Sequence, residues 1–109
     1  MPVFKNSGLT AISPVATSPD LTGASDYFFR VCVSDAYVGT LCANMCKDLG
    51  YSNIGVLYEN DDYGYGLYTK FEEQVKKNGG KIGYAGNFVL GETKDFNSLL
   101  TSVKNEGCD

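Results

Sequence analysis

Two short polar segments concentrate the hydrogen-bonding side chains of this 109-residue chain. Residues 11–22 read AISPVATSPDLT and carry serine and threonine hydroxyls on a loop that Pro14 and Pro19 stiffen. Residues 59–66 read ENDDYGYG and place two aspartates beside Tyr63. Hydroxyls and backbone groups on a loop can bind a small polar molecule, whereas neighbouring aspartates can bind a metal ion or cap a helix.

The composition argues against catalysis and metal binding. The chain has no histidine, which is the commonest general base and a frequent zinc ligand. The GYG of residues 64–66 is too short for a phosphate-binding glycine loop. Asp61 and Asp62 directly precede a predicted helix, where aspartates more often serve as caps and dipole partners. We therefore expect no catalytic residue, no metal site and no cofactor.

The spacing of the four cysteines leaves their chemical state open. Cys42 and Cys46 are four residues apart and share one face of a helix, as buried apolar residues or a redox pair would. Cys32 and Cys108 are isolated, unlike the close pairs that bind zinc. An even number of cysteines does not establish disulfides.

Charge and hydropathy exclude two classes of partner. The net charge is −4, and the only basic cluster is Lys76–Lys77 near a predicted helix end, so we expect no nucleic-acid binding. The sequence has no apolar run of about 18 residues that could cross a membrane. No signal peptide is visible.

Strands and helices are predicted to alternate along the chain. After a helix end that stops at Gly8, the expected strands are residues 9–13, 27–33, 54–58 and 81–89, and the expected helices are residues 35–49, 64–78 and 95–107. This order predicts an α/β fold with a parallel sheet and flanking helices. In such sheets ligands bind in the loops at the carboxyl ends of strands, here residues 13–20 and 59–66.

Apolar spacing also predicts which surfaces are buried. The run IGVLY at residues 54–58 predicts a strand covered on both faces. On the helix at residues 35–49, helical spacing predicts one apolar face that consists of Val38, Leu41, Cys42, Met45 and Leu49.

Four stretches of the chain resemble one protein family in the same order and at similar spacing. They are ISPVATSPDLT, YFFRVCVSDAYVG, IGVLYENDDYGYGL and GETKDFNSLLTSVKNEG. Together they resemble the type I periplasmic binding proteins of the branched-chain amino-acid class, the solute receptors of ABC importers. The resemblance covers residues 8–108, and ISPVATSPDLT is its most specific motif.

Members of that family are several times longer and have two α/β lobes around a ligand cleft. The resemblance therefore implies a fragment with an incomplete sheet. Residues 1–26 are expected to be the end of the first lobe with a ligand loop, residues 27–34 a crossing between the lobes, and residues 35–109 part of the second lobe. On this basis Arg30 is expected to pair with a carboxylate or backbone carbonyls near the hinge.

The resemblance also implies ligand contacts at Val15, Ala16, Thr17 and Tyr63. The Val15 carbonyl would accept from an amino-acid ammonium group. Thr17 would offer its backbone N–H and its hydroxyl, mainly to the carboxylate. Tyr63, from the second lobe, would cover the ligand when the cleft closes. Val15 departs from the small residue usual there, so its side chain either crowds the ligand or points away.

The function implied is capture of a branched-chain-like amino acid outside the cytoplasm, in the periplasm or on the cell surface, and its delivery to an ABC permease. The alternatives are a flavodoxin-like enzyme or signalling module, and the effector domain of a sensor or transcription regulator with the same fold. A truncated sheet exposes strand edges and apolar helix faces, so we expect a homo-oligomer. Exchange of residues 9–34 between two chains is one route to it.

Overall fold

The computed structural model of the protein describes residues 2–109 and shows helices and strands in the expected alternation. In chain order the elements are α1 (Pro2–Ser7), β1 (Ala11–Ser13), the 3-10 helix η1 (Pro19–Leu21), β2 (Phe28–Arg30), α2 (Asp35–Asp48), β3 (Asn53–Glu59), α3 (Asp62–Lys77), β4 (Lys81–Phe88) and α4 (Asn97–Asn105). The predicted extended segment at residues 27–33 is a strand only over the three residues of β2, and the other boundaries agree within about two residues.

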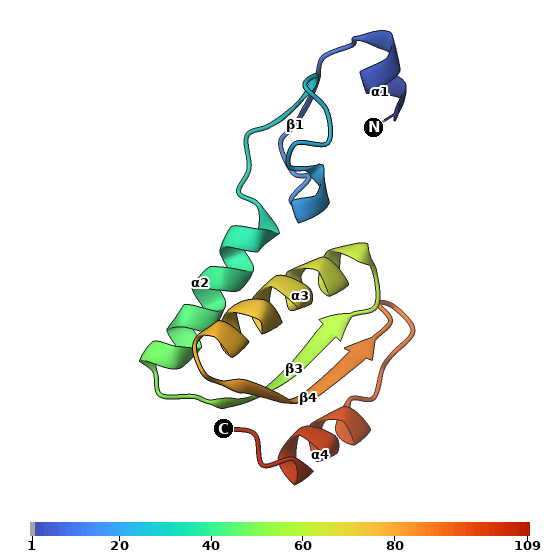
Figure 1. Ribbon diagram of the computed structural model, residues 1–109. Helices are drawn as coiled ribbons and strands as arrows, with labels where there is room; N and C mark the ends of the chain where they lie inside the picture. The colour runs from blue at the N-terminus through green and yellow to red at the C-terminus, as the bar shows by residue number, and fades with distance from the viewer. Residues whose placement is uncertain (1) are drawn as a thin grey trace.

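The described elements form two parts joined by residues 31–34 (Figure 1). In the smaller part β1 pairs in parallel with β2, with Ile12 opposite Phe29. In the larger part β3 pairs in parallel with β4, with Val56 opposite Ala85. Helices α2 and α3 lie on one side of the larger sheet and α4 on the other. The predicted α/β class and the parallel pairing are therefore confirmed.

Local caps start the two long helices. The Ser34 hydroxyl accepts a hydrogen bond from the Ala36 N–H at the start of α2, at 3.3 Å. The Asp61 carboxylate accepts one from the Gly64 N–H at the start of α3, at 2.6 Å. The prediction that an aspartate before α3 serves as a cap is confirmed at Asp61.

Helices α2 and α3 approach closely where α2 carries small residues. A Cβ added at Gly39 would lie 2.8 Å from the Phe71 backbone nitrogen. One turn later Ala43 is only 1% exposed. The face of α2 that packs on α3 is therefore the line of Asp35, Gly39 and Ala43, which are its buried residues.

The apolar face predicted for α2 is largely exposed within residues 2–109, as expected for apolar helix faces beside an incomplete sheet. Leu41 is 46% exposed, Met45 is 53% exposed and Leu49 is 67% exposed. These residues lie on α2 roughly a quarter turn or more around from Gly39 and Ala43, so they face away from the α3 contact. Small residues form the contact because they let the backbones of α2 and α3 approach closely.

The strand β3 is likewise only partly covered. Every residue from Asn53 to Glu59 is half-buried, although IGVLY predicted a strand covered on both faces. Helix α3 packs on one face and α4 on the other, but the only strand paired with β3 is β4. One edge of β3 therefore has no neighbouring strand among residues 2–109.

The chain is elongated and buries little apolar surface. Its Cα radius of gyration is 16.8 Å, against about 13 Å for a compact domain of this length. It exposes 7202 Å², against about 5900 Å² for a compact monomer of its mass. Among the described residues, Ala43 and Val75 are the only fully buried hydrophobic side chains.

The α2–α3 contact yields a stability prediction from two glycines. Gly39→Ala places a methyl group against the α3 backbone, so we expect a loss of about 1–3 kcal/mol in the free energy of unfolding. Gly66→Ala, in α3, meets only Pro19 Cδ at 3.8 Å and should be neutral or raise stability by up to about 1 kcal/mol. Urea unfolding followed by circular dichroism measures both, and equal effects of the two substitutions would contradict the close-contact explanation.

Candidate ligand-binding site

Ser13, the last residue of β1, holds the loop that follows the strand in a defined shape. The Ser13 hydroxyl accepts hydrogen bonds from the backbone N–H groups of Val15 and Ala16, at 3.3 and 3.0 Å. Such a serine turn satisfies backbone groups where the strand ends. The predicted segment VAT therefore leaves β1 in a defined conformation at the carboxyl end of that strand.

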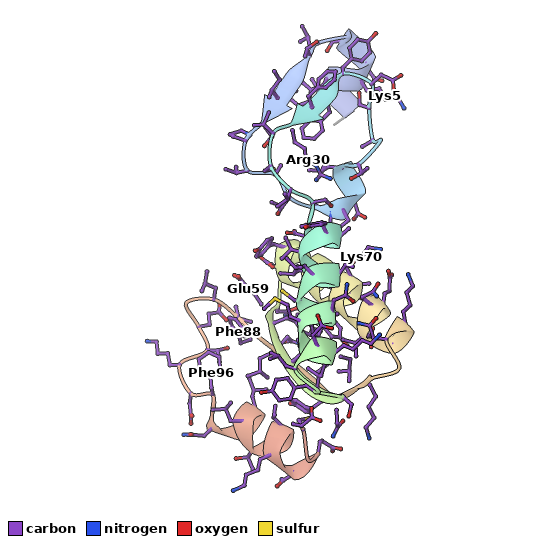
Figure 2. The ribbon with its side chains drawn as sticks, turned by 90° about the vertical axis from the view of Figure 1, so that its left-hand side faces the viewer. Lys5, Arg30, Glu59, Lys70, Phe88 and Phe96 are labelled. Atoms are coloured by element: carbon purple, nitrogen blue, oxygen red, sulfur yellow. The ribbon has the colours of Figure 1, made fainter. Side chains whose placement is uncertain are left out.

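Arg30, at the end of β2, clamps the same loop from the other side. Its guanidinium donates to the carbonyl oxygens of Ala16 (3.3 Å) and Ser18 (2.7 Å) and to the Thr22 hydroxyl (2.5 Å). The position of Arg30 between the crossing and the loop can be followed in Figure 2. The predicted pairing of Arg30 with backbone carbonyls is confirmed. A planar guanidinium with several fixed donors suits this task better than a lysine would.

Thr17 connects the loop to the first turn of α2 by two hydrogen bonds. Its hydroxyl donates to Asp35 Oδ2 at 2.9 Å, and its carbonyl accepts from the Asp35 N–H at 2.9 Å. Asp35 is only 3% exposed, so its carboxylate depends on such donors. Because the Thr17 hydroxyl donates its hydrogen to Asp35, its oxygen remains free to accept another hydrogen bond.

Several backbone groups of the loop remain free for another molecule. No described residue hydrogen-bonds to the carbonyl oxygens of Pro14 and Val15 or to the N–H groups of Thr17 and Ser18. The Ala16 N–H and carbonyl, in contrast, are both engaged by the chain itself. The Val15 side chain is 78% exposed, so in the described chain it points to solvent rather than into the loop.

Tyr63 lies on the first turn of α3, directly after the carboxyl end of β3. Gly64 beside it is buried, and a Cβ at that position would collide with the carbonyl oxygen of Glu59. The absence of a side chain at residue 64 therefore lets α3 start close against β3 and fixes the backbone that carries Tyr63. The Tyr63 side chain is 53% exposed.

Tyr63 borders an open groove of about 570 Å³, which we call the β3-edge groove. The groove is lined by Gly39, Cys42 and Cys46 of α2, residues 54–59 of β3, Tyr63, Gly64, Leu67, Tyr68 and Phe71 of α3, and Phe88 of β4. The lining is mainly apolar, with Glu59 as its one charged member. The ring of Phe88 packs edge-on against that of Phe96, with the ring centres 5.4 Å apart. Figure 2 labels both residues and Glu59.

Aromatic and sulfur groups in this groove have raised pKa values. Tyr68 stacks on Tyr58 with the ring centres 4.7 Å apart. Burial and the hydrogen bond to Glu72 raise the pKa of Tyr68 to about 12. Burial and the neighbouring Cys42 raise the pKa of Cys46. Both groups are therefore neutral near pH 7, and all four cysteines are free.

The loop and the Tyr63 segment approach each other, although they do not share the groove. Pro19 Cδ lies 3.8 Å from the place where a Cβ of Gly66 would stand, three residues after Tyr63. The lining of the β3-edge groove includes Tyr63 but none of Val15, Ala16 and Thr17. The binding roles of all four residues thus stay predictions. The pairing of Asp35 with Thr17 was not predicted, because no local pattern connects two residues that are 18 positions apart.

Within residues 2–109, no group of three or more histidine, cysteine, aspartate or glutamate side chains could hold a metal ion. In the same range, each helix is too short or too polar to cross a membrane.

Comparisons with known proteins agree on one class. A family model described as the receptor family ligand binding region matches residues 2–108. An amino acid binding protein of Pseudomonas aeruginosa is 32% identical over an alignment of 110 positions, which covers 98% of this chain and 29% of the relative. The Leu/Ile/Val-binding protein homolog 3 of Brucella melitensis is 28% identical and matches the same shares of the two chains.

Solved structures are similar over the same range. An ABC transporter substrate-binding protein from Desulfitobacterium hafniense, in complex with Leu, is 30% identical with a TM-score of 0.79 and covers 98% of this chain and 32% of its own. A leucine binding protein from Thermotoga maritima is 25% identical with a TM-score of 0.86 and covers 98% and 31%. The chain thus spans about a third or less of the relatives it matches.

Parallel strands with polar loops at their carboxyl ends, joined by a short crossing, define an α/β ligand-receptor fold. The chain belongs to the receptor family ligand binding region family. The resemblance to the type I solute-binding proteins of ABC importers is confirmed by the relatives and by the structures.

The Thr17–Asp35 pair yields a prediction about the loop. Thr17→Val removes the hydroxyl at almost constant volume and leaves the buried carboxylate one donor short. We expect a loss of about 1–3 kcal/mol in the free energy of unfolding. Thr17→Ser keeps the hydroxyl and is the matched control. Urea unfolding measures both, and equal stability of the two variants would show that the hydrogen bond to Asp35 contributes nothing.

Proposed function

We propose that this chain carries part of the binding site of a solute-binding protein that captures an amino acid for ABC import. The observation that supports this most directly is that the Val15 carbonyl and the Thr17 N–H, on a loop held by Ser13, Arg30 and Asp35, have no partner among residues 2–109. A carbonyl and an N–H two residues apart match the two charges of a zwitterionic amino acid. Relatives named for leucine, isoleucine and valine favour a branched-chain ligand.

From the hydrogen bonds within the loop we propose a different role for each of its ligand-binding groups. The free N–H of Thr17 can donate to the ligand carboxylate. The Val15 carbonyl can accept from the ammonium group. The Thr17 hydroxyl, whose hydrogen is held by Asp35, can accept from the ammonium as well and cannot donate to the carboxylate at the same time. Ala16 would contribute through the backbone conformation that it shares with these neighbours.

Tyr63 would complete the site from the opposite segment. Its exposed ring stands at the start of α3, and the loop reaches α3 one turn further on through Pro19 and Gly66. A small movement of the two parts about residues 31–34 would bring the ring over a ligand held by the loop. Covering the ligand would exclude water and strengthen its hydrogen bonds.

The parent protein is proposed to act without catalysis, outside the cytoplasm, in the periplasm or as a cell-surface lipoprotein. It would deliver its ligand to an ABC permease. The relatives are named as binding proteins, and one similar structure is named as an ABC transporter substrate-binding protein. In this division residues 1–26 and 35–109 belong to two lobes, and residues 27–34 cross between them.

The isolated chain is also proposed to self-associate. It exposes 7202 Å², roughly 1300 Å² more than a compact monomer of its mass. Much of that surface is apolar, including Leu41, Met45 and Leu49 on α2. Apolar surface of this extent favours association.

The binding proposal predicts weak, localised binding by the 109-residue chain. Ligand pockets normally bury about 70–90% of the ligand, which one loop and one tyrosine cannot do. We expect a Kd no better than about 1 mM for leucine, isoleucine or valine. In a titration followed by NMR, amide shifts should appear at Val15–Thr17 and near Tyr63.

Tyr63→Ala should reduce the shift changes near α3, whereas Tyr51→Ala, at the opposite end of β3, should not. Glycerol at the same concentrations controls for effects of the solution. Absence of shifts at residues 15–17 with every amino acid would overturn the proposed site. Micromolar binding would contradict the expectation that the chain holds only part of it.

A further inference from the structure

We propose that Ser13 and Arg30 are positioning residues that polarise the loop after β1. Ser13 prepares the first half of the loop to accept from an ammonium group, and Arg30 prepares the second half to donate to a carboxylate. This inference rests on the proposed amino-acid site and adds the two residues that set its preference for a zwitterion. Both act through peptide units of the loop and not by touching the ligand.

The first half of the loop leaves carbonyl oxygens without a partner. The N–H groups of Val15 and Ala16 both donate to the Ser13 hydroxyl oxygen, at 3.3 and 3.0 Å. The carbonyl oxygens at the other ends of these two peptide units belong to Pro14 and Val15, and neither has a partner among residues 2–109. A hydrogen bond at one end of a peptide unit polarises the group at the other end. Ser13 therefore strengthens both carbonyls as acceptors for a cation.

The second half of the loop shows the opposite pattern. The Ala16 carbonyl oxygen accepts from the Arg30 guanidinium at 3.3 Å, and the N–H of the same peptide unit, that of Thr17, has no partner in the described chain. In the next unit the Thr17 carbonyl accepts from the Asp35 N–H at 2.9 Å, and the Ser18 N–H has no described partner either. Acceptors therefore precede donors along the loop, which matches the two charged groups of one amino acid.

Arg30 brings a full positive charge to the donor half. In the described chain its guanidinium bonds to neutral oxygens, those of Ala16, Ser18 and Thr22. The ion pairs within residues 2–109 join lysines and glutamates of α3, so none of them neutralises this charge. A charge-assisted hydrogen bond polarises its acceptor more strongly than a neutral one does. The peptide unit between Ala16 and Thr17 is therefore the strongest donor site for a ligand carboxylate.

Three probes separate the two halves of the loop. Leucine carries both charged groups, isocaproate lacks the ammonium group and leucinol lacks the carboxylate. NMR titrations of the 109-residue chain follow the amides of residues 15–18 with each probe. The variants are Arg30→Gln and Ser13→Ala. The control is Lys5→Gln, which removes the same charge from an exposed side chain of α1 in the same part of the chain (Figure 2).

We expect Arg30→Gln to weaken binding of leucine and isocaproate by about threefold or more and to leave leucinol unchanged within about twofold. Ser13→Ala should show the reverse preference and weaken leucine and leucinol more than isocaproate. Lys5→Gln should change none of the three. Arg30→Lys keeps the charge without the planar fork, so it should give an intermediate loss.

A measurement without ligand tests the polarisation itself. Arg30→Gln should shift the carbonyl-carbon resonance of Ala16 and the amide-nitrogen resonance of Thr17. Ser13→Ala should instead shift the carbonyl carbon of Val15 and the amide nitrogen of Ala16. Circular dichroism checks that each variant is folded, and Arg30→Lys carries the same comparisons if Arg30→Gln does not fold.

The outcomes separate this inference from the proposed function. Equal weakening of all three probes by Arg30→Gln shows that Arg30 only shapes the loop, and overturns the inference while amino-acid binding stands. Unchanged affinities, or unchanged resonances of Ala16 and Thr17 in the ligand-free variant, overturn it as well. If the unsubstituted chain shows no shift at residues 15–18 with any probe, the proposed amino-acid site is overturned and this inference with it.

Discussion

The reciprocal hydrogen bonds between Thr17 and Asp35 connect the two parts of this molecule. They join the loop after β1 to the buried start of α2, on the two sides of the connecting residues 31–34. Helix α2 in turn packs on α3 through Gly39, and α3 carries Tyr63 at its first turn. The proposed ligand groups, 46 residues apart in sequence from Thr17 to Tyr63, thus depend on the hydrogen bond that the buried Asp35 carboxylate accepts from Thr17.

A loop that offers free backbone groups must be held rigid by its remaining polar groups. Ser13 and Arg30 engage neighbouring groups, and the Val15 carbonyl and the Thr17 N–H are among the backbone groups of the loop that have no partner in the described chain. Pre-ordering of this kind lowers the entropy that a ligand must overcome. The same loop explains the small share of regular structure near β1, because its hydrogen bonds run between side chain and backbone instead of between strands.

The small number of buried hydrophobic side chains limits how the helices and strands are held together. With Ala43 and Val75 as the only fully buried hydrophobic side chains described, the helices are held mainly by the α2–α3 contact and by the two-stranded sheet. Surfaces that the sequence marks as interior, such as IGVLY and the Leu41–Met45 face, remain half-covered or exposed. An apolar pattern in the sequence indicates a surface that can be buried, but it does not show which helix or strand packs against that surface.

The sequence alone determined the order of elements, the parallel α/β class and the loops at the strand ends, because hydrophobic period and capping residues act locally. It also identified the family, and it offered a carboxylate or backbone carbonyls as the partners of Arg30, of which the structure shows the carbonyls. Only the tertiary structure decided that Gly39 and Ala43, not Leu41 and Met45, form the α2–α3 contact. It alone paired Thr17 with Asp35, so that the Thr17 hydroxyl donates its hydrogen to that carboxylate. Both outcomes depend on how closely backbones distant in sequence approach, which no local pattern records.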